Sequence, residues 1–409
     1  MRDRSTEPVD PNLPVGKRIQ YYRTKRGMSR EVLGGLVGKT GRWVRAVESG
    51  RLQTPKLPVL LAIAEALKIR DLGQLLGGQP MPTSTFRGPG HPALPAVRDA
   101  INAIGVPDTA PPRLDHLAAR VAAAWRARHA APDHRTVLGG LLPELIRDAR
   151  HAAYAYGGDD RRRALALLAE VYNLTQFFVA YQPDSGLLWR VAERALLTAQ
   201  EAEEPRTIGG AVWLLAEAHR DAGDLDAAEQ VIRDGMELLR PRLEQGGDDL
   251  RAMWGALHAA AAYTAARAGQ KGTAWGWWDR AEEIARSLPA DHYDPLTSFS
   301  RVVMGAHAVT LAVELRQSGE SRRQAARHAA AAIPSQPRRG RHLVEVARAW
   351  QTAGDHAAAV DALADGYATA PETIRFNGYA RQMITEYAGK PGPLRAPARD
   401  LAERVGLLV

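Results

Sequence analysis

The residues between positions 40 and 56 include arginine, lysine and hydroxyl side chains, which contact the phosphates and base edges of nucleic acids. Arg42 and Arg45 lie three positions apart after Thr40, a spacing that places them on one side of a helix. The first amides of a helix attract anions because they have no partner within the helix. The pattern predicts a helix that enters the major groove, with Arg42 in its first turn best placed to reach a base.

Two sets of positions follow from this placement. The positions predicted to face the bases are Gly41, Arg42, Trp43, Arg45 and Ala46. The positions predicted to hold phosphates lie at helix starts or in the basic loop that follows, and they are Arg30, Thr40, Arg51, Thr54 and Lys56. For Trp43, packing against the preceding helix is an equally good interpretation.

The elements that would position these side chains are two short helices with a tight turn between them. Ser29 is predicted to cap the first helix, whose inward positions would be Val32, Leu33 and Leu36. Gly38 can adopt the left-handed turn conformation that a side chain would disfavour. Thr40 is predicted to cap the second helix, in which Val44 and Val47 point inward. This is the pattern of a helix-turn-helix.

The sequence around this pattern is similar to the XRE family of helix-turn-helix regulators, which includes the phage repressors and Cro. The second helix ends in Glu48, Ser49 and Gly50, and the basic, proline-containing loop RLQTPK follows it. The resemblance covers about residues 14–78. It implies that Arg23 forms an ion pair with Glu48 and that the segment binds double-stranded DNA. Gly41 and Ala46 stand where members of the family often carry base-reading side chains, so fewer side chains are expected to read the operator.

Charge is distributed unevenly along the 409 residues, a length that suggests two or more domains. Residues 1–80 contain 15 Lys and Arg against 7 Asp and Glu, whereas the remainder contains 39 of each class. The absence of cysteine excludes disulfides, cysteine-based metal sites and thiol nucleophiles. With neither a secretory signal nor an apolar run of 18 residues, the chain is expected to be cytoplasmic, associated with the nucleoid and not with a membrane.

Alanine-rich, valine-poor composition favours an all-α fold in several parts. We expect a disordered arm at 1–12, a five-helix DNA-binding domain at 13–78, a Pro/Gly-rich linker at 79–112 and a helical array at 113–409. In the array a turn of the form small, Gly, polar recurs as AGD at 222–224, AGQ at 268–270, SGE at 318–320 and AGD at 353–355. Alanine-rich helices flank each copy, which predicts an α-solenoid of helical hairpins with a concave surface.

The hairpins are similar to tetratricopeptide repeats, although the turn-to-turn spacings of 46, 50 and 35 residues depart from the regular 34 of that family. The whole layout resembles that of XRE regulators with repeat domains from actinobacteria. In related peptide-sensing regulators an asparagine on the concave face holds the ligand. The resemblance therefore suggests that Asn173 belongs to an effector pocket. Trp213 and Trp277 are further candidates for this pocket, because tryptophans at the inner face of a solenoid can contact a ligand, and core packing is the alternative for the tryptophan cluster at 275–278.

Catalytic and metal-binding motifs give no support for an enzyme. The segment GGLVGKT at 34–40 is one residue too short for a phosphate-binding P-loop, and neither H-E-x-x-H nor G-x-S-x-G occurs. His129 and His134 are expected at the surface, and no cofactor or metal is expected. The sequence thus predicts a homodimeric transcription regulator that senses a small molecule, peptide or protein. The alternative is an adaptor that recruits a partner protein to DNA without a small effector.

Overall fold

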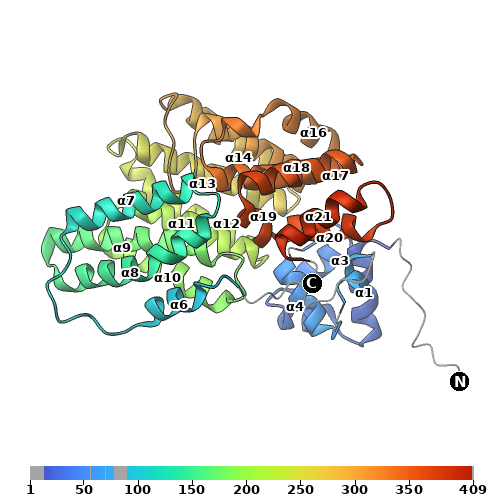
Figure 1. Ribbon diagram of the computed structural model, residues 1–409, viewed down its shortest axis with the longest axis horizontal. Coiled ribbons are helices and arrows are strands. Elements are labelled where there is room, and N and C mark those ends of the chain that lie inside the picture. Colours follow the sequence, from blue (N-terminus) through green and yellow to red (C-terminus); the bar gives the residue numbers. More distant parts are fainter. Residues whose placement is uncertain (1–12, 56, 70, 78–89, 408–409) are drawn as a thin grey trace, which may run out of the picture.

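The structure is a computed structural model that describes residues 13–55, 57–69, 71–77 and 90–407 (Figure 1). This part of the chain contains 21 α-helices and no strand, so the all-α prediction is confirmed. A small N-terminal domain lies beside a larger helical array, near the C-terminal helices α20 (Gly378–Gly389) and α21 (Arg395–Val405) (Figure 1). The predicted arm at 1–12 lies outside the described residues.

Five helices form the N-terminal domain, as predicted: α1 (Val15–Lys25), α2 (Arg30–Leu36), α3 (Gly41–Glu48), α4 (Leu57–Ala66) and α5 (Gly73–Leu76). The two predicted caps are present. Ser29 Oγ accepts a hydrogen bond from the amide of Val32, and Thr40 Oγ1 accepts one from the amide of Trp43, both at 3.1 Å. Each cap satisfies one of the free amides at a helix start. The turn between the helices has Gly38 at φ +66°, in the left-handed region.

The packing of α2 differs from the prediction, because of its three expected inward residues only Leu33 is buried. Val32 is 52% exposed and Leu36 is 60% exposed. Gly34 faces inward instead, and a Cβ at this position would lie 2.7 Å from the carbonyl oxygen of Lys39. Such close contact leaves α2, which has only seven residues, a narrow buried side consisting of Leu33 and Gly34.

Sixteen further helices make up the rest of the described chain. The first eight are α6 (Leu94–Asn102), α7 (Leu114–Ala130), α8 (His134–Ala155), α9 (Gly158–Val179), α10 (Ser185–Ala202), α11 (Pro205–Asp221), α12 (Leu225–Leu239) and α13 (Gly247–Arg267). Then follow α14 (Lys271–Ser287), α15 (Met304–Glu314), α16 (Ser318–Arg327), α17 (Gln336–Thr352), α18 (His356–Thr369), α19 (Pro371–Phe376), α20 and α21. No described helix combines the length and apolarity needed to cross a membrane.

The array closes on itself. Helices α7, α9, α11, α13, α15 and α17 each contact the next, and α17 contacts α7 again. At the closure His129 Nε2 lies 2.7 Å from the carbonyl of Pro295, and Nδ1 lies 2.8 Å from Ser335 Oγ. Because a carbonyl only accepts, Nε2 carries the proton and Nδ1 accepts from the serine. The helical hairpins predicted from the sequence are thus present, and they surround a central space.

The turns between hairpins share one hydrogen-bond pattern, in which an amide closes back on the carbonyl five residues earlier. The four donor amides are those of Asp224, Gln270, Gln317 and Asp355, with distances of 2.9 to 3.0 Å. This bond satisfies a carbonyl at the helix end, and a residue with positive φ makes it possible. In the first, second and fourth turns this residue is a glycine, as predicted. In the third turn it is Arg316, at φ +56°. The predicted glycine of this turn, Gly319, lies inside α16.

One boundary prediction also needs correction. Helix α6 lies within the stretch 79–112 assigned to a linker, and its apolar side is buried in the main core of the array through Leu94, Val97 and Ile101. The array thus begins about 20 residues earlier than predicted. Helix α8 runs without a break from His134 to Ala155, with Pro143 in its interior.

Candidate nucleic-acid interface

Helix α3 presents two arginines to solvent. Arg42 and Arg45 are exposed, while Val44 and Val47 are buried in the core of the N-terminal domain. The cap residue Thr40 is exposed at the start of the helix. This arrangement leaves a basic helix N-terminus open, which is the geometry that a recognition helix needs.

The other three positions predicted to face bases are less accessible. Ala46 is only 9% exposed, because the chain after α3 folds back so that the amide of Leu52 donates to the carbonyl of Ala46 at 3.0 Å. Ala46 is therefore removed from the base-contact set. Gly41 lies under the Glu31 side chain, and a Cβ there would be 2.6 Å from Glu31 Oε1. Trp43 is half-buried and packs against the domain core.

A buried carboxylate joins three helices of the domain. Glu48, 2% exposed, accepts from Arg23 Nε at 2.5 Å and from Arg30 Nε at 2.6 Å. Arg23 also donates to the carbonyl of Met28 at 2.5 Å. The structure thus brings together Arg23 and Glu48, as the sequence predicts, and adds Arg30. Because Glu48 holds the Nε atom of Arg30, only the other guanidinium nitrogens of this predicted phosphate contact remain for DNA.

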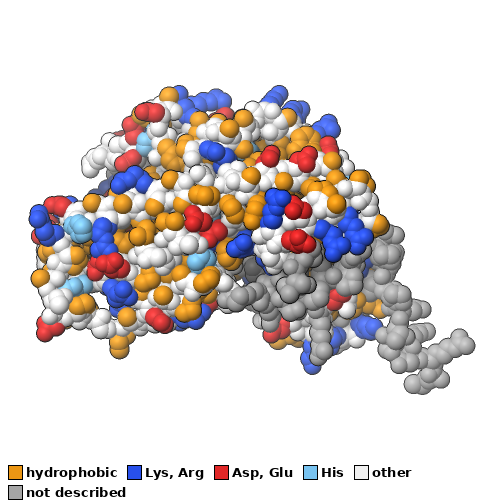
Figure 2. Space-filling model, in the orientation of Figure 1, with side chains coloured by type: hydrophobic (Ala, Val, Ile, Leu, Met, Phe, Trp, Pro, Cys, Tyr) orange, Lys and Arg blue, Asp and Glu red, His pale blue; other side chains and the backbone are white. Residues whose placement is uncertain are grey.

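The remaining predicted phosphate contacts surround the same surface. Arg51 is exposed in the loop after α3, and Thr54 is half-buried farther along it. Lys56 lies outside the described residues. On the array, by contrast, Figure 2 shows basic and acidic side chains interspersed, in keeping with the equal numbers of the two classes after residue 80. The excess of basic over acidic residues thus belongs to the N-terminal part of the chain, residues 1–80.

The N-terminal domain packs against the turns between the helical hairpins of the array. Gln53 Nε2 donates to the carbonyl of Val313, near the end of α15, at 3.3 Å. A Cβ on Gly223 would lie 3.0 Å from Lys39 Cε, and a Cβ on Gly269 would lie 3.2 Å from the carbonyl oxygen of Arg51. Burial lowers the pKa of Lys39, and the neighbouring Asp224 partly offsets this. Three consecutive hairpin turns therefore contact the segments on either side of α3.

A narrow cleft of about 20 Å³ marks the same contact. Its lining residues from the N-terminal domain are Trp43, Leu52, Gln53, Pro55 and Val59, and those from the array are Gly223, Leu225 and Arg267. So small a residual space shows that the two surfaces pack closely. Trp43 thus contributes to the interdomain contact as well as to the domain core.

A separate pocket lies at the centre of the ring. Each of the six inner helices contributes to its wall, in the order Arg128, Gln176, Trp213, Tyr263, His307 and Arg338. Of the three residues predicted for an effector pocket, only Trp213 lines it. Asn173 is completely buried and faces α11, since a Cβ on Gly210 would lie 3.3 Å from its amide nitrogen. Trp277 packs beside His258 and Arg280, with ring centroids 5.3 Å apart for the first pair.

Sequence reasoning missed the charged residues of this pocket. Arg128, Arg135, Arg338 and Arg341 line it, and they come from α7, α8 and α17. The only sequence signal was the local clustering of basic residues around positions 128–135 and 338–341. His134, which was expected at the surface, is also buried in this wall, and burial lowers its pKa to about 2.

Comparison with known proteins bears on the N-terminal part of the chain. Residues 15–75 match a helix-turn-helix domain family. This domain is characteristic of DNA-binding regulators, and its limits agree with α1 to α5. No curated protein matches the chain significantly. Among solved structures, the crystal structure of BtubC (BKLC) from P. vanneervenii is similar at 15% identity, covering 68% of this chain and 94% of that chain, with a TM-score of 0.38. A likeness at that level carries no conclusion about function.

Proposed function

We propose that the protein is a sequence-specific transcription regulator whose helical array receives a signal and controls the DNA-binding domain. The single observation that carries this proposal is the contact between the helix-turn-helix domain and the hairpin turns, made through Lys39, Gln53 and the main chain of Arg51. A domain that only tethered the array to DNA would not require the array to touch the segments that flank its recognition helix.

This contact affects DNA binding because it lies beside the recognition helix. The major groove is about 12 Å wide and is bordered by two phosphate strands. When α3 enters the groove, Lys39 before it and Arg51 after it lie near these strands. In the described arrangement the array occupies space beside both residues. The domain should therefore bind DNA more weakly while it contacts the array than after it has separated from the array, although Arg42 and Arg45 are exposed.

Dimerisation is the second part of the proposal. Only two side chains of α3 are both exposed and suited to base recognition, so one domain recognises few base pairs. Regulators of this kind obtain affinity from two domains about one helical turn of DNA apart. We propose that the tetratricopeptide-like array supplies the dimer contact. On this proposal the protein acts in the cytoplasm, at the nucleoid, and binds its effector without transforming it.

A charge placed in the cleft tests control by the array. Leu225→Lys puts a like charge into the cleft that Arg267 also lines, and it changes none of the predicted DNA contacts. Leu238→Lys on the exposed face of α12 adds the same charge away from the cleft and is the matched control. We expect Leu225→Lys to bind tighter than the control to a duplex selected from random DNA by the full-length protein. The expected factor is about 5 to 150, the usual range of allosteric coupling.

Equal DNA affinities of the two variants would contradict the proposal that the array controls DNA binding. Light scattering of the full chain in the same experiment reports the oligomeric state. A monomer on and off DNA would refute the dimer, and a protein that stably co-purifies in place of a small effector would favour the adaptor interpretation.

A further inference from the structure

We infer that the pocket at the centre of the ring binds a small anionic ligand, in which a carboxylate or phosphate is joined to an apolar body. The inference rests on the proposed function, because it names the chemical class of the signal that the array receives. It is argued from the charges of the wall, the unmet hydrogen bonds, the apolar surface and the connection to the N-terminal domain.

The first observation is a group of arginines without ion pairs. In the described part of the chain, no carboxylate lies within ion-pair distance of the Arg128, Arg135 or Arg338 guanidinium. Arg128 stacks on Phe177, with 3.8 Å between its guanidinium carbon and the ring centroid. Arg135 donates to the carbonyls of Phe177 and Phe178 at 2.8 and 2.6 Å. Buried cations are normally paired, so this arrangement is costly unless an anion enters.

The carboxylates and histidines of the wall do not balance these cations. Two acidic residues, Glu217 and Asp221, line the pocket, and Glu217 is already paired with Arg220 of the same helix. Burial lowers the pKa of His134 to about 2 and that of His307 to about 3, so both are neutral at pH 7. Burial likewise lowers the pKa of Arg128 and Arg135 to about 10, which leaves both arginines charged. Glu372, outside the pocket lining, partly offsets this shift at Arg135, but it accepts from the main-chain amide of Arg135 and forms no ion pair with its guanidinium. The wall thus carries an excess of positive charge.

The second observation is a set of buried polar atoms without partners. Arg128 Nε, Arg135 Nε and Gln176 Oε1 lack hydrogen-bond partners, and their residues are 8%, 5% and 3% exposed. All three residues line the pocket. Two of these atoms donate, as recognition of an anion requires, and the third accepts, as a hydroxyl or amide on the ligand could satisfy.

Apolar surface occupies the rest of the wall. Phe177, Trp213, Leu214, Leu296 and Leu311 line the pocket with the arginines. The cavity volume is about 210 Å³, below the roughly 300 to 1,000 Å³ of sites for drug-sized molecules. A compact ligand with one anionic end and a small ring or branched body fits both features.

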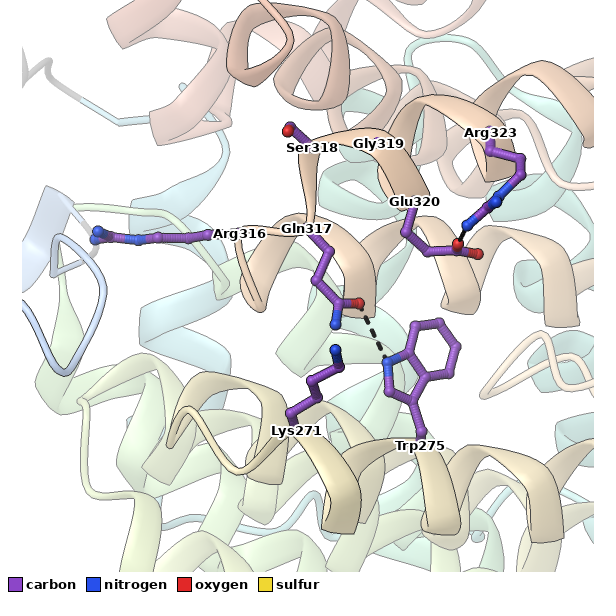
Figure 3. Close-up of a pocket in the computed structure, with 8 residues that line it drawn as sticks. All are labelled: Lys271, Trp275, Arg316, Gln317, Ser318, Gly319, Glu320 and Arg323. Carbon is purple, nitrogen blue, oxygen red and sulfur yellow. Dashed lines mark hydrogen bonds and ion pairs between the residues drawn. The ribbon is translucent and has the colours of Figure 1, made fainter.

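A larger hollow at the edge of the array has a different character. It has a volume of about 640 Å³ and lies between α14 and α16 (Figure 3). Its polar groups pair with one another: Trp275 Nε1 donates to Gln317 Oε1 at 3.3 Å, and Glu320 pairs with Arg323. Arg316 points away from the other labelled side chains, toward the blue ribbon of the N-terminal domain (Figure 3). The central pocket, with its unmet donors, is the better ligand site.

The central pocket is connected to the cleft beneath the DNA-binding domain by a chain of buried ion pairs. Arg341 lines the pocket and pairs with Glu345. Arg348 bridges Glu345 at 2.6 Å and Glu314 at 2.8 Å. Glu314 in turn lies 3.4 Å from Arg267, which lines the cleft. An anion that draws Arg341 away from Glu345 would alter the pairs that Arg348 forms with Glu345 and Glu314. Ligand binding thereby has a physical route to the cleft between the array and the helix-turn-helix domain.

The test uses the full-length protein and three probes of similar size: phenyl phosphate, benzoate and the neutral benzyl alcohol. Binding is measured by calorimetry and by the shift in melting temperature. Arg338→Gln removes one unpaired cation of the wall, and Arg322→Gln removes an exposed arginine of α16 as the control. We expect at least one anion to bind more tightly than benzyl alcohol. Its affinity should fall about tenfold or more in Arg338→Gln, because a charge-assisted hydrogen bond is lost, and should be unchanged in Arg322→Gln.

Three results would overturn the inference: no anion binds at millimolar concentration, benzyl alcohol binds as well as the anions, or the two arginine variants behave alike. If Arg338→Gln fails to fold, Arg128→Gln supplies the same comparison from another helix. DNA affinity is measured separately with and without the bound anion. A protein that binds the anion but no DNA would refute the proposed function and leave the pocket standing. A protein that binds DNA and responds to no anion would do the reverse.

Discussion

Replacing Glu48 by Gln should destabilise the helix-turn-helix domain more than any surface change. The carboxylate is 2% exposed and holds Arg23, whose side chain is 10% exposed, together with the more open Arg30. Removing one partner of a buried pair leaves an uncompensated charge, which costs about 3 to 5 kcal/mol. The half-exposed contact to Arg30 contributes under about 1 kcal/mol. For a domain of this size each 1 kcal/mol lowers the melting temperature by about 4 to 8 °C.

Hydrogen exchange of the full-length protein, read by mass spectrometry on peptides from residues 15–75, isolates this domain from the array. We expect the amides of α1 and α3 to exchange faster by the factor that corresponds to 3 kcal/mol, about 150-fold, while peptides of α7 to α18 are unchanged. Lys17→Gln on the exposed side of α1 is the control and should change protection by less than about 0.5 kcal/mol. Unchanged exchange together with lost DNA binding would mean that Glu48 recognises DNA instead of stabilising the domain.

Four further changes have distinct expected outcomes. Arg42→Ala should cost about 1 to 3 kcal/mol on a selected duplex and relax the preference for one base, whereas an equal loss on random DNA would make Arg42 a phosphate contact. Arg51→Ala should weaken binding to all duplexes and reduce the slope of log affinity against log salt by about one, as titrations at several salt concentrations would show. Gly223→Ala should lower the melting temperature, because φ is +77° at this turn and the added Cβ meets Lys39; an unchanged melting curve would contradict this. Burial lowers the pKa of His134 in the folded state to about 2, so below about pH 6.5 the unfolded chain binds one proton more than the folded chain. The free energy of unfolding therefore falls by about 1.4 kcal/mol per pH unit as the pH decreases. His134→Gln should flatten that dependence in melting curves between pH 7 and 5.

Local spacing made the DNA-binding domain predictable. The caps Ser29 and Thr40, the turn at Gly38 and the inward Val44 and Val47 all depend on residues within one helix or one turn. Exposure was harder to predict, because it depends on what the rest of the chain covers. Val32 and Leu36 are apolar but exposed, since the close approach of Gly34 to the following backbone limits the buried side of α2.

The array shows the same division between local and long-range information. Helical hairpins with glycine turns could be read from the sequence, but the closure of the ring depends on contacts such as His129 with Ser335, 206 residues apart. The central arginines come from helices that the sequence separates widely, so no local pattern brings Arg128 and Arg338 to one pocket. Asn173 was chosen from its residue type alone, and the structure buries it between helices.

The specificity ratio of the full-length protein for DNA tests the central claim most directly. It is the affinity for a duplex selected from a random pool divided by the affinity for a shuffled duplex of the same composition, both measured at one physiological salt concentration. Sequence-specific regulators bind their sites about 10³- to 10⁷-fold more tightly than other DNA. We predict a ratio within this range that decreases when Arg42 and Arg45 are replaced by alanine. A ratio near one, or a high ratio that survives both substitutions, would contradict the assignment of α3 as the recognition helix.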